Sequence, residues 1–378
     1  MSEATCPHRQ PCPGCPRLGQ RGIAPEAMDA LTLVAARAGL PEPVVHEGSP
    51  WSFRRRAKLA VRGRSTSPKL GIFQADSHRI VDMPRCPIHH PLINRVAQEV
   101  RAGIRETGLA PYADRPHRGL LRYVQIAVDD SGTRAQLAVV TNDRSPESMD
   151  PLATQLRDRL GDALQGLWWN GNPERTNSIF GPHWAHLAGD KRLELEVGGV
   201  RIHVPPGAFA QNHGQLFERL VERVRSLVPN QVRVREFYAG TGPIGLGLAD
   251  RCRAVEFNEV DPHALVGLAT GLAQLPPEAR SRCRVLPGRA GECLDDLESV
   301  DIAIVDPPRK GLDPELIEAL CAGAVPQLVY VSCGWRSFET ESALLSEAGL
   351  LLRSLEAYAM FPYTEHVEIV AHFARAAT

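Results

Sequence analysis

The 378-residue chain lacks any apolar run of about 18 residues, the length that a membrane-spanning helix requires. Its first residues, MSEATCPHRQ, lack the apolar core of a secretory signal peptide. Internal repeats and low-complexity segments are missing as well. We therefore expect a soluble, cytoplasmic monomer with no membrane partner. Its nine cysteines should stay out of disulfides, because the cytoplasm is reducing.

A strong net charge is also missing, since 43 basic residues face 44 acidic ones. The charges are nevertheless unevenly distributed. Residues 1–125 hold 19 Lys and Arg against 10 Asp and Glu, so this part is positive and the rest is negative. A basic segment favours a polyanionic partner such as a nucleic acid, because phosphate attraction dominates sequence-independent affinity. A solvated, Arg-rich surface explains the charge equally well.

The length favours two domains. Before residue 205, helical stretches at 25–39, 91–107 and 150–164 alternate with strand-like runs such as YVQIAV and LELEV, which predicts an α+β domain over 1–204. From residue 205, a helix at 214–227 precedes short apolar strands separated by helical segments. That rhythm predicts an α/β domain over 205–378 with a doubly wound, mostly parallel sheet of the Rossmann-like type.

Residues 234–249, VREFYAGTGPIGLGLA, place Gly240, Gly242 and Gly245 in a G-x-G-x-x-G array between a strand and an expected helix. Such glycines let the backbone approach a ligand closely. Glu259 ends the next strand, where a carboxylate can accept hydrogen bonds from a ribose diol. NAD-dependent enzymes and methyltransferases share this arrangement. For Glu259, the alternative is an exposed strand-end carboxylate that binds no cofactor.

Asp306 closes the apolar strand VDIAIVD and is followed by Pro-Pro-Arg. This sequence projects a carboxylate and a rigid loop over the crevice, as methyltransferases that act on bases and amides do. It has no evident role in a dehydrogenase, so it favours S-adenosylmethionine over NAD. An ordinary turn is the alternative, because proline often interrupts regular structure.

Cys333 ends the apolar strand QLVYVSC, and Glu368 begins the last strand. Carbon 5 of uracil is a weak nucleophile, so its methylation requires a thiolate at carbon 6 and a base that removes the carbon 5 proton. These two residues can fill both roles, although a buried packing thiol is the alternative for Cys333. Because an ordinary thiol is only slightly ionised at neutral pH, we expect help from the strand-end environment or from the substrate.

Two further groups lie in the N-terminal half. Cys6, Cys12 and Cys15 form C-x5-C-x2-C, Cys86 follows later, and each precedes a proline. Four thiolates can hold a [4Fe-4S] cluster or zinc, and the prolines favour the cluster, in a structural role.

A basic run contains Arg54, Arg56 and Lys58 beside Trp51 and Phe53, which suits phosphate contact next to a stacking platform. Strand alternation would place Arg54 and Arg56 on one face and the residue between them on the other. A solvated strand end is the alternative.

Taken in order, these motifs resemble the RNA 5-methyluridine methyltransferase family over nearly the whole chain. The resemblance rests on the cysteine-rich start and on SFRRRAKLAV, LGIFQADSHRIVDMPRCPIHHPLIN, WNGNPERTNSIFG, GAFAQNH, EFYAGTGPIGL, VDPPRKG, YVSCGW and MFPYTEHVE. It implies a class I methyltransferase domain, S-adenosylmethionine, an iron-sulfur RNA-binding domain, Cys333 as nucleophile and Glu368 as base. The implied cofactor site comprises Gln211, Tyr238, Gly240, Gly242, Glu259 and Asp306.

The layout is most similar to the iron-sulfur branch that acts on 23S ribosomal RNA, without the small TRAM domain of some members. Three positions depart from the family pattern: Gly334-Trp335 replaces Asn-Pro, His213 replaces an Asn, and Arg289 replaces an acidic residue near the adenine. They bear on substrate choice and cofactor affinity. Two alternatives stay open, a base amino-group RNA methyltransferase that uses Asp306-Pro-Pro and an inactive RNA-binding or assembly factor.

Overall fold

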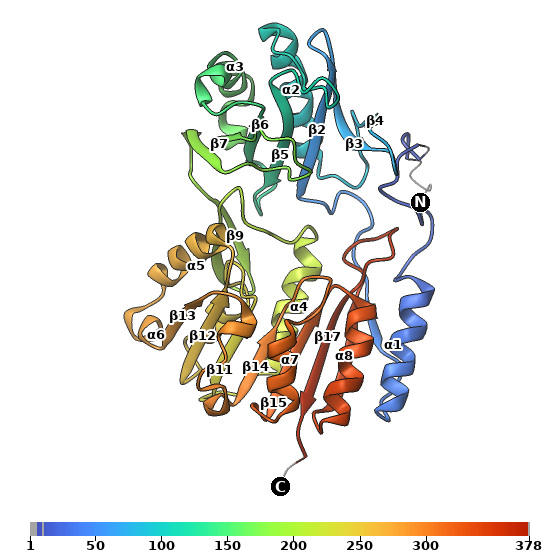
Figure 1. Ribbon diagram of the computed structural model, residues 1–378, viewed down its shortest axis with the longest axis vertical. Helices are drawn as coiled ribbons and strands as arrows, with labels where there is room; N and C mark the ends of the chain where they lie inside the picture. Colours follow the sequence, from blue (N-terminus) through green and yellow to red (C-terminus); the bar gives the residue numbers. More distant parts are fainter. Residues whose placement is uncertain (1–5, 10, 377–378) are drawn as a thin grey trace. The chain divides into compact units, whose positions relative to one another are not determined.

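The computed structural model, which describes residues 6–9 and 11–376, divides into two compact units (Figure 1). The first unit contains the N-terminal segment through Leu18, Ser49–Leu195 and Val204–Asn212. The second contains Gly19–Gly48, Glu196–His203 and the chain from His213 onward. The units therefore alternate along the sequence.

This division differs from the single boundary expected at residue 204. Helix α1 (Pro25–Arg37) shares a hydrophobic core with α8 (Trp335–Glu347), and strand β1 (Val44–His46) pairs in parallel with β16 (Leu351–Tyr358). Residues 19–48 belong to the second unit because their apolar side chains and their backbone find partners there.

The first unit is built on a seven-stranded sheet of order β4-β3-β2-β5-β6-β7-β8. All neighbouring strands are antiparallel except β6 and β7, which α3 connects. The elements are β2 (Arg56–Arg64), β3 (Ser67–Phe73), β4 (Ile80–Asp82), α2 (Pro91–Thr107), β5 (Leu121–Val128), β6 (Ala135–Thr141), η1 (Pro146–Met149), α3 (Asp150–Leu160), η2 (Gly161–Ala163), β7 (Leu164–Gly171) and β8 (His183–Gly189).

The two faces of this sheet differ. Alternate residues of β2, such as Leu59 and Val61, pack with α2 and α3 in one apolar core. Helix α2 has the bounds expected from the sequence, with proline at its first turn and Gly108 at φ 70° just after its end, where glycine is favoured. The opposite face carries polar and aromatic residues, and Val204–Asn212 crosses part of it, since Gln125 Nε2 donates to Pro206 O at 2.6 Å.

The second unit has an eight-stranded sheet of order β1-β16-β17-β15-β14-β11-β12-β13, which is parallel except for the pairings of β17. A two-stranded sheet of β9 and β10 lies in the connection that joins the units. The remaining elements are β9 (Leu193–Val197), β10 (Val200–Val204), α4 (Gly214–Ser226), β11 (Arg233–Phe237), η3 (Gly245–Leu248), β12 (Ala254–Glu259), α5 (Pro262–Gln274), α6 (Pro277–Ser281), β13 (Cys283–Pro287), η4 (Ala290–Glu292), η5 (Leu297–Ser299), β14 (Ile302–Val305), α7 (Pro314–Cys321), β15 (Gln327–Ser332) and β17 (Glu368–Ala374).

Helices cover both faces of this sheet, as its buried central strands require. All four residues of β14 are buried. Helices α1, α7 and α8 share a core with one face, and α4 lies behind the sheet in Figure 1. The doubly wound, mostly parallel sheet expected for this part of the chain is therefore confirmed. Within the described residues, none of the helices is both long and apolar enough to cross a membrane.

Candidate active site

The residues expected to carry the chemistry lie at one edge of the second unit's sheet. Asp306 directly follows β14, whose Val305 pairs with Tyr330 of the parallel strand β15. Ser332 of β15 pairs with Ile369 of the antiparallel strand β17. Cys333 directly follows β15 and therefore lies beside the first residue of β17, Glu368. The sheet register thus brings the thiol and both carboxylates to the same edge.

The surroundings of Cys333 oppose its ionisation. Burial raises the pKa of this thiol to about 12, and the negative charges of Glu368 and Asp306 add to the effect. Arg309 is the nearby cation that acts in the opposite direction. Burial and the two carboxylates at this edge oppose formation of the thiolate, so they do not give the help expected from the strand-end environment. Help from the substrate, the other half of that expectation, stays a prediction.

Asp306 is poised to exchange a proton. The residue is partly accessible at the end of β14. Burial and the charge of Glu259 raise the pKa of Asp306 to about 7. At neutral pH the group is therefore divided between its protonated and ionised forms, so it can donate or accept a hydrogen bond at the crevice.

The glycine loop is held by Glu259. Its Oε2 accepts a hydrogen bond from Gly240 N at 2.7 Å, and its Oε1 accepts one from Asp261 N at 2.7 Å. Gly240 and Gly242 have φ values of 59° and 83°, which favour glycine. A Cβ at Gly240 would meet nothing within 4 Å. The loop therefore presents bare backbone to open space, as a cofactor-binding loop requires.

Two charged side chains that the sequence reasoning missed support this loop from behind. Glu236 is buried, accepts a hydrogen bond from Gly245 N at 2.9 Å, and has its pKa raised to about 8 by burial. Arg225 donates to Pro243 O at 2.6 Å. A Cβ at Gly247 would lie 2.2 Å from Arg225 Cζ. The sequence signalled Glu236 only as a charged residue within the strand VREFYAG, and it did not mark Arg225 at all.

The helix expected after the glycine array is only the 3₁₀ helix η3 (Gly245–Leu248). A Cβ at its first residue, Gly245, would lie 2.3 Å from Glu236 Oε2, so the backbone there approaches the buried carboxylate closely. Gly247, the second glycine of this segment, also disfavours a longer helix.

Tyr238 follows β11 with a φ of 58°, which is unusual for a residue with a side chain. Its hydroxyl accepts a hydrogen bond from Asp313 N at 2.9 Å, and burial raises its pKa to about 12. Arg289 Nε lies 3.7 Å from the buried carboxylate of Asp313. The arginine that replaces the family's acidic residue is thus paired with a carboxylate from the start of α7, a residue that the sequence did not single out.

The other two departures from the family pattern have structural roles. His213 is buried and caps α4, where its Nδ1 accepts a hydrogen bond from Leu216 N at 3.5 Å. Gly334 precedes α8, and a Cβ there would lie 2.6 Å from Arg309 O. The glycine allows the loop after Cys333 to approach the Asp-Pro-Pro-Arg loop closely. Gln211 belongs to the first unit and the other expected cofactor residues belong to the second, so the role of Gln211 stays a prediction.

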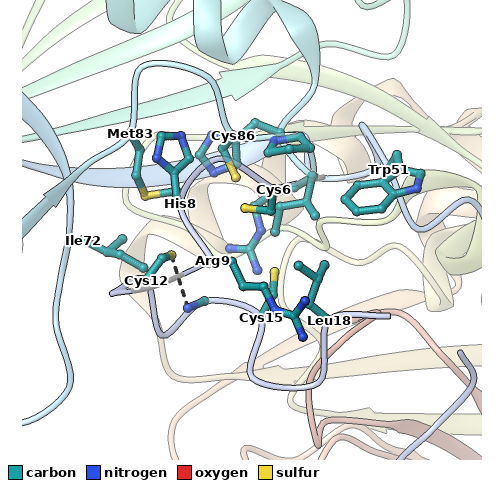
Figure 2. A pocket seen from close by; sticks show the side chains of 15 residues that line it. Cys6, His8, Arg9, Cys12, Cys15, Leu18, Trp51, Ile72, Met83 and Cys86 are labelled. Atoms are coloured by element: carbon teal, nitrogen blue, oxygen red, sulfur yellow. Dashed lines mark hydrogen bonds between the residues drawn. The ribbon is translucent and has the colours of Figure 1, made fainter. Parts of the chain in front are cut away.

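The four N-terminal cysteines line one cavity of about 90 Å³ in the first unit. Figure 2 shows the sulfur atoms of Cys6, Cys12, Cys15 and Cys86 directed toward the same space. Cys86 is held by Asn94, whose Oδ1 accepts from Cys86 N and whose Nδ2 donates to Cys86 O, both at 3.1 Å. In the described chain, no three His, Cys, Asp or Glu side chains are grouped so that they could hold a metal ion.

The predicted RNA-binding run is divided between two places. Arg54 precedes β2 and lines the cysteine cavity, and its backbone N donates to Ile88 O at 2.9 Å. Arg56 Nη2 donates to Gln125 Oε1 at 2.7 Å on the polar face of the sheet. Lys58 lies on that same face. The expected alternation failed for Arg54 because the regular strand begins only at Arg56.

The sequence is similar to those of known proteins. Residues 277–375 match the family model described as tRNA (Uracil-5-)-methyltransferase. An uncharacterized RNA methyltransferase of Protochlamydia amoebophila is 36% identical, over 98% of this chain and 97% of that protein. One of Gloeobacter violaceus is 31% identical, over 99% of this chain and 83% of that protein.

The fold is also similar to a solved structure. The Pyrococcus abyssi tRNA (uracil-54, C5)-methyltransferase, in complex with S-adenosyl-L-homocysteine, superimposes with a TM-score of 0.74 at 22% identity. The match covers 92% of this chain and 83% of that one. It extends over both units.

Proposed function

The chain belongs to the S-adenosylmethionine-dependent RNA uracil-C5 methyltransferase family, and we propose that it forms 5-methyluridine in 23S ribosomal RNA through a covalent intermediate on Cys333. The observation that carries the covalent mechanism is the register of β15 and β17, which places Cys333 beside Glu368. An amino-group methyltransferase needs no thiol at this position. An inactive binding factor needs neither residue.

The reaction proceeds in three steps on the chain's own groups. The Cys333 sulfur adds to carbon 6 of uracil, which breaks the carbon 5–carbon 6 double bond and makes carbon 5 nucleophilic. Carbon 5 then accepts the electrophilic methyl group that bound S-adenosylmethionine would supply, the bond between that methyl and the sulfonium sulfur breaks, and S-adenosylhomocysteine leaves. Glu368 then removes the proton from carbon 5, the double bond forms again, and the Cys333 sulfur leaves.

The charges at this edge explain when the thiol becomes active. Glu368 and Asp306 both raise the pKa of Cys333. Because the pKa of Asp306 is about 7, protonation of that carboxyl removes one of the two opposing charges near neutral pH. We infer that Cys333 stays protonated in the free enzyme and ionises as the RNA base enters. Such a thiol is protected from alkylation and oxidation between turnovers.

We also propose that Cys6, Cys12, Cys15 and Cys86 hold a [4Fe-4S] cluster. A cluster is wider than a single ion, so it suits sulfurs that line one cavity without meeting at one point. Zinc would need all its ligands within about 2.3 Å of one centre. Methyl transfer needs no electron, so the cluster's role is to fasten the N-terminal segment to the connection between β4 and α2.

The choice of 23S ribosomal RNA rests on the cysteine pattern, which resembles the ribosomal branch of the family. We expect the protein to act as a cytoplasmic monomer. The test is to map 5-methyluridine in ribosomal and transfer RNA from a strain that lacks the gene, and to restore either the wild-type protein or Cys333→Ala. Loss at one 23S uridine, restored only by the wild type, is expected. Loss of 5-methyluridine only from transfer RNA would show that transfer RNA, and not 23S ribosomal RNA, is the substrate. No loss of 5-methyluridine from either RNA would overturn the proposed reaction.

A further inference from the structure

The motif WNGNPERTNSIFG, residues 169–181, has no part in the chemistry described above. It comprises the end of β7 and most of the loop that leads to β8 in the first unit. Asn170 Nδ2 donates to Gly181 O at 2.9 Å, and its Oδ1 accepts from Gly181 N at 2.8 Å. Asn172 Nδ2 donates to Ser178 O at 2.8 Å. Both asparagines are buried, so their amides hold the loop from within.

Two further contacts fix this loop. The buried guanidinium of Arg122 donates to Asn172 O and, at 2.8 Å, to Glu174 O. A Cβ at Gly181 would lie 2.0 Å from Gly171 O, so only glycine allows the two ends of the loop to approach so closely. These hydrogen bonds fix the conformation of the loop. They therefore also fix the position of Phe180, which directly precedes Gly181.

Phe180 begins a row of half-buried aromatic rings. Its ring centre lies 5.0 Å from that of Trp184, and Trp184 lies 6.3 Å from Trp168. Trp168 in turn lies 5.0 Å from His186, its partner across β7 and β8. Because Trp169 points into the core, Trp168 points to the opposite, polar face of the sheet. The rings therefore form one aromatic surface on that face.

A cation borders this aromatic surface. Lys58 is exposed, and its Nζ lies 4.7 Å from the Phe180 ring centre. Within the described residues, no carboxylate is in ion-pair distance of Lys58. Desolvation of the ammonium group and the nearby charge of Arg56 lower its pKa to about 8. With this pKa the ammonium group stays mostly charged at neutral pH, so the position favours a negatively charged ligand.

We propose that Phe180 and Trp184 stack an unpaired base of the RNA substrate while Lys58 contacts the adjoining phosphate. This inference rests on the proposed function for the nature of the partner. A single-stranded nucleotide combines a flat ring and an anionic phosphate, which are the two features that this surface complements. Stacking needs no particular base, so the surface holds the strand near the target without reading its sequence.

The test compares two labelled single-stranded oligoribonucleotides by fluorescence anisotropy, one with all its bases and one with abasic sites. Phe180→Leu keeps the apolar volume but removes the ring, so it should weaken binding of the complete strand about tenfold. It should leave binding of the abasic strand unchanged, and Phe180→Trp should restore the wild-type difference. Lys58→Met should weaken both strands and reduce the salt slope by about 1.

Phe73→Leu is the matched control, because Phe73 is another half-buried ring beside a cation, 5.1 Å from the Arg62 guanidinium, on β3. It should change neither affinity. Equal loss with Phe73→Leu and Phe180→Leu, or a wild type that does not distinguish the two strands, would overturn the inference. Base-dependent binding without any uracil methylation by the wild type would overturn the proposed reaction and leave this surface standing.

Discussion

The two cysteine sites of the molecule differ in the neighbours that the fold gives them. At the sheet edge of the second unit, Cys333 lies with Glu368 and Asp306, whose charges raise its pKa. In the first unit, Cys15 lies among other thiols whose charges would also raise its pKa, while the nearby Arg54 acts to lower it. Burial raises the pKa of both thiols to about 12.

Because burial raises the pKa of both thiols to a similar value, the comparison teaches that the neighbouring groups are what distinguish the two sites. A lone thiol between carboxylates stays protonated until a substrate reaches it, which suits a nucleophile used once in each turnover. Several thiols around one cavity lose their protons together when a metal centre binds, because ligation requires thiolates. Arg54 then offsets part of the negative charge that such a centre carries.

The sharpest test of the first site is Glu368→Gln. This change should permit addition and methyl transfer but stop removal of the carbon 5 proton, so methylated RNA should remain attached through Cys333. We expect turnover to fall by several orders of magnitude and a slowly migrating protein–RNA band to appear on a denaturing gel. Cys333→Ala should lose turnover and form no such band. Normal turnover by Glu368→Gln would assign proton removal to another group.

The second site is tested by its metal. Anaerobically purified protein should be brown and contain about four iron atoms per chain. Cys86→Ser should lose most of that iron and lower the melting temperature, while calorimetry should show unchanged binding of S-adenosylhomocysteine. Cys252→Ser is the matched control, because Cys252 is also buried but lies outside the cavity. A colourless protein with one zinc ion would refute the cluster.

The smallest expected effect concerns the carboxylates beside Cys333. Removing a negative charge lowers the pKa of the thiol, so Asp306→Asn should speed alkylation of Cys333 by iodoacetamide severalfold at pH 8. The gain should fade at pH 6, because Asp306, with a pKa of about 7, is then largely protonated in the wild type. Arg309→Gln should act in the opposite direction. Peptide mass spectrometry measures the rates, and equal rates in all three proteins would contradict the electrostatic account.

Much of the active-site edge could be predicted from the sequence. Asp306 and Cys333 each end an apolar run, and Glu368 begins one. In a sheet whose strands are mostly parallel, the carboxyl ends of neighbouring strands meet at one edge. A local pattern is enough to place such residues, because the strand itself carries the side chain there. The observed sheet confirms the strands that these local patterns predicted.

The rest depended on contacts between distant segments. The basic run suggested one surface, but Arg54 lies beside Cys86 while Lys58 contacts Phe180. Glu236 and Arg225 support the glycine loop through hydrogen bonds that the spacing of residues in the sequence does not predict. Helix α1 was assigned to the first domain because it precedes the first domain's strands. Its packing against α8, which lies far along the chain, is what places it in the second unit.

The pairing of β1 with β16 has a consequence for synthesis on the ribosome. His46 and Glu356 form a 2.8 Å hydrogen bond across 310 residues. Helix α1 and β1 emerge early from the exit tunnel, but their partners α8 and β16 are made near the end of translation. For most of that time the apolar face of α1, including Ala27 and Leu31, has no native partner. We therefore expect chaperones or transient collapse of the nascent chain to cover the apolar face of α1 until the last strands have been synthesised.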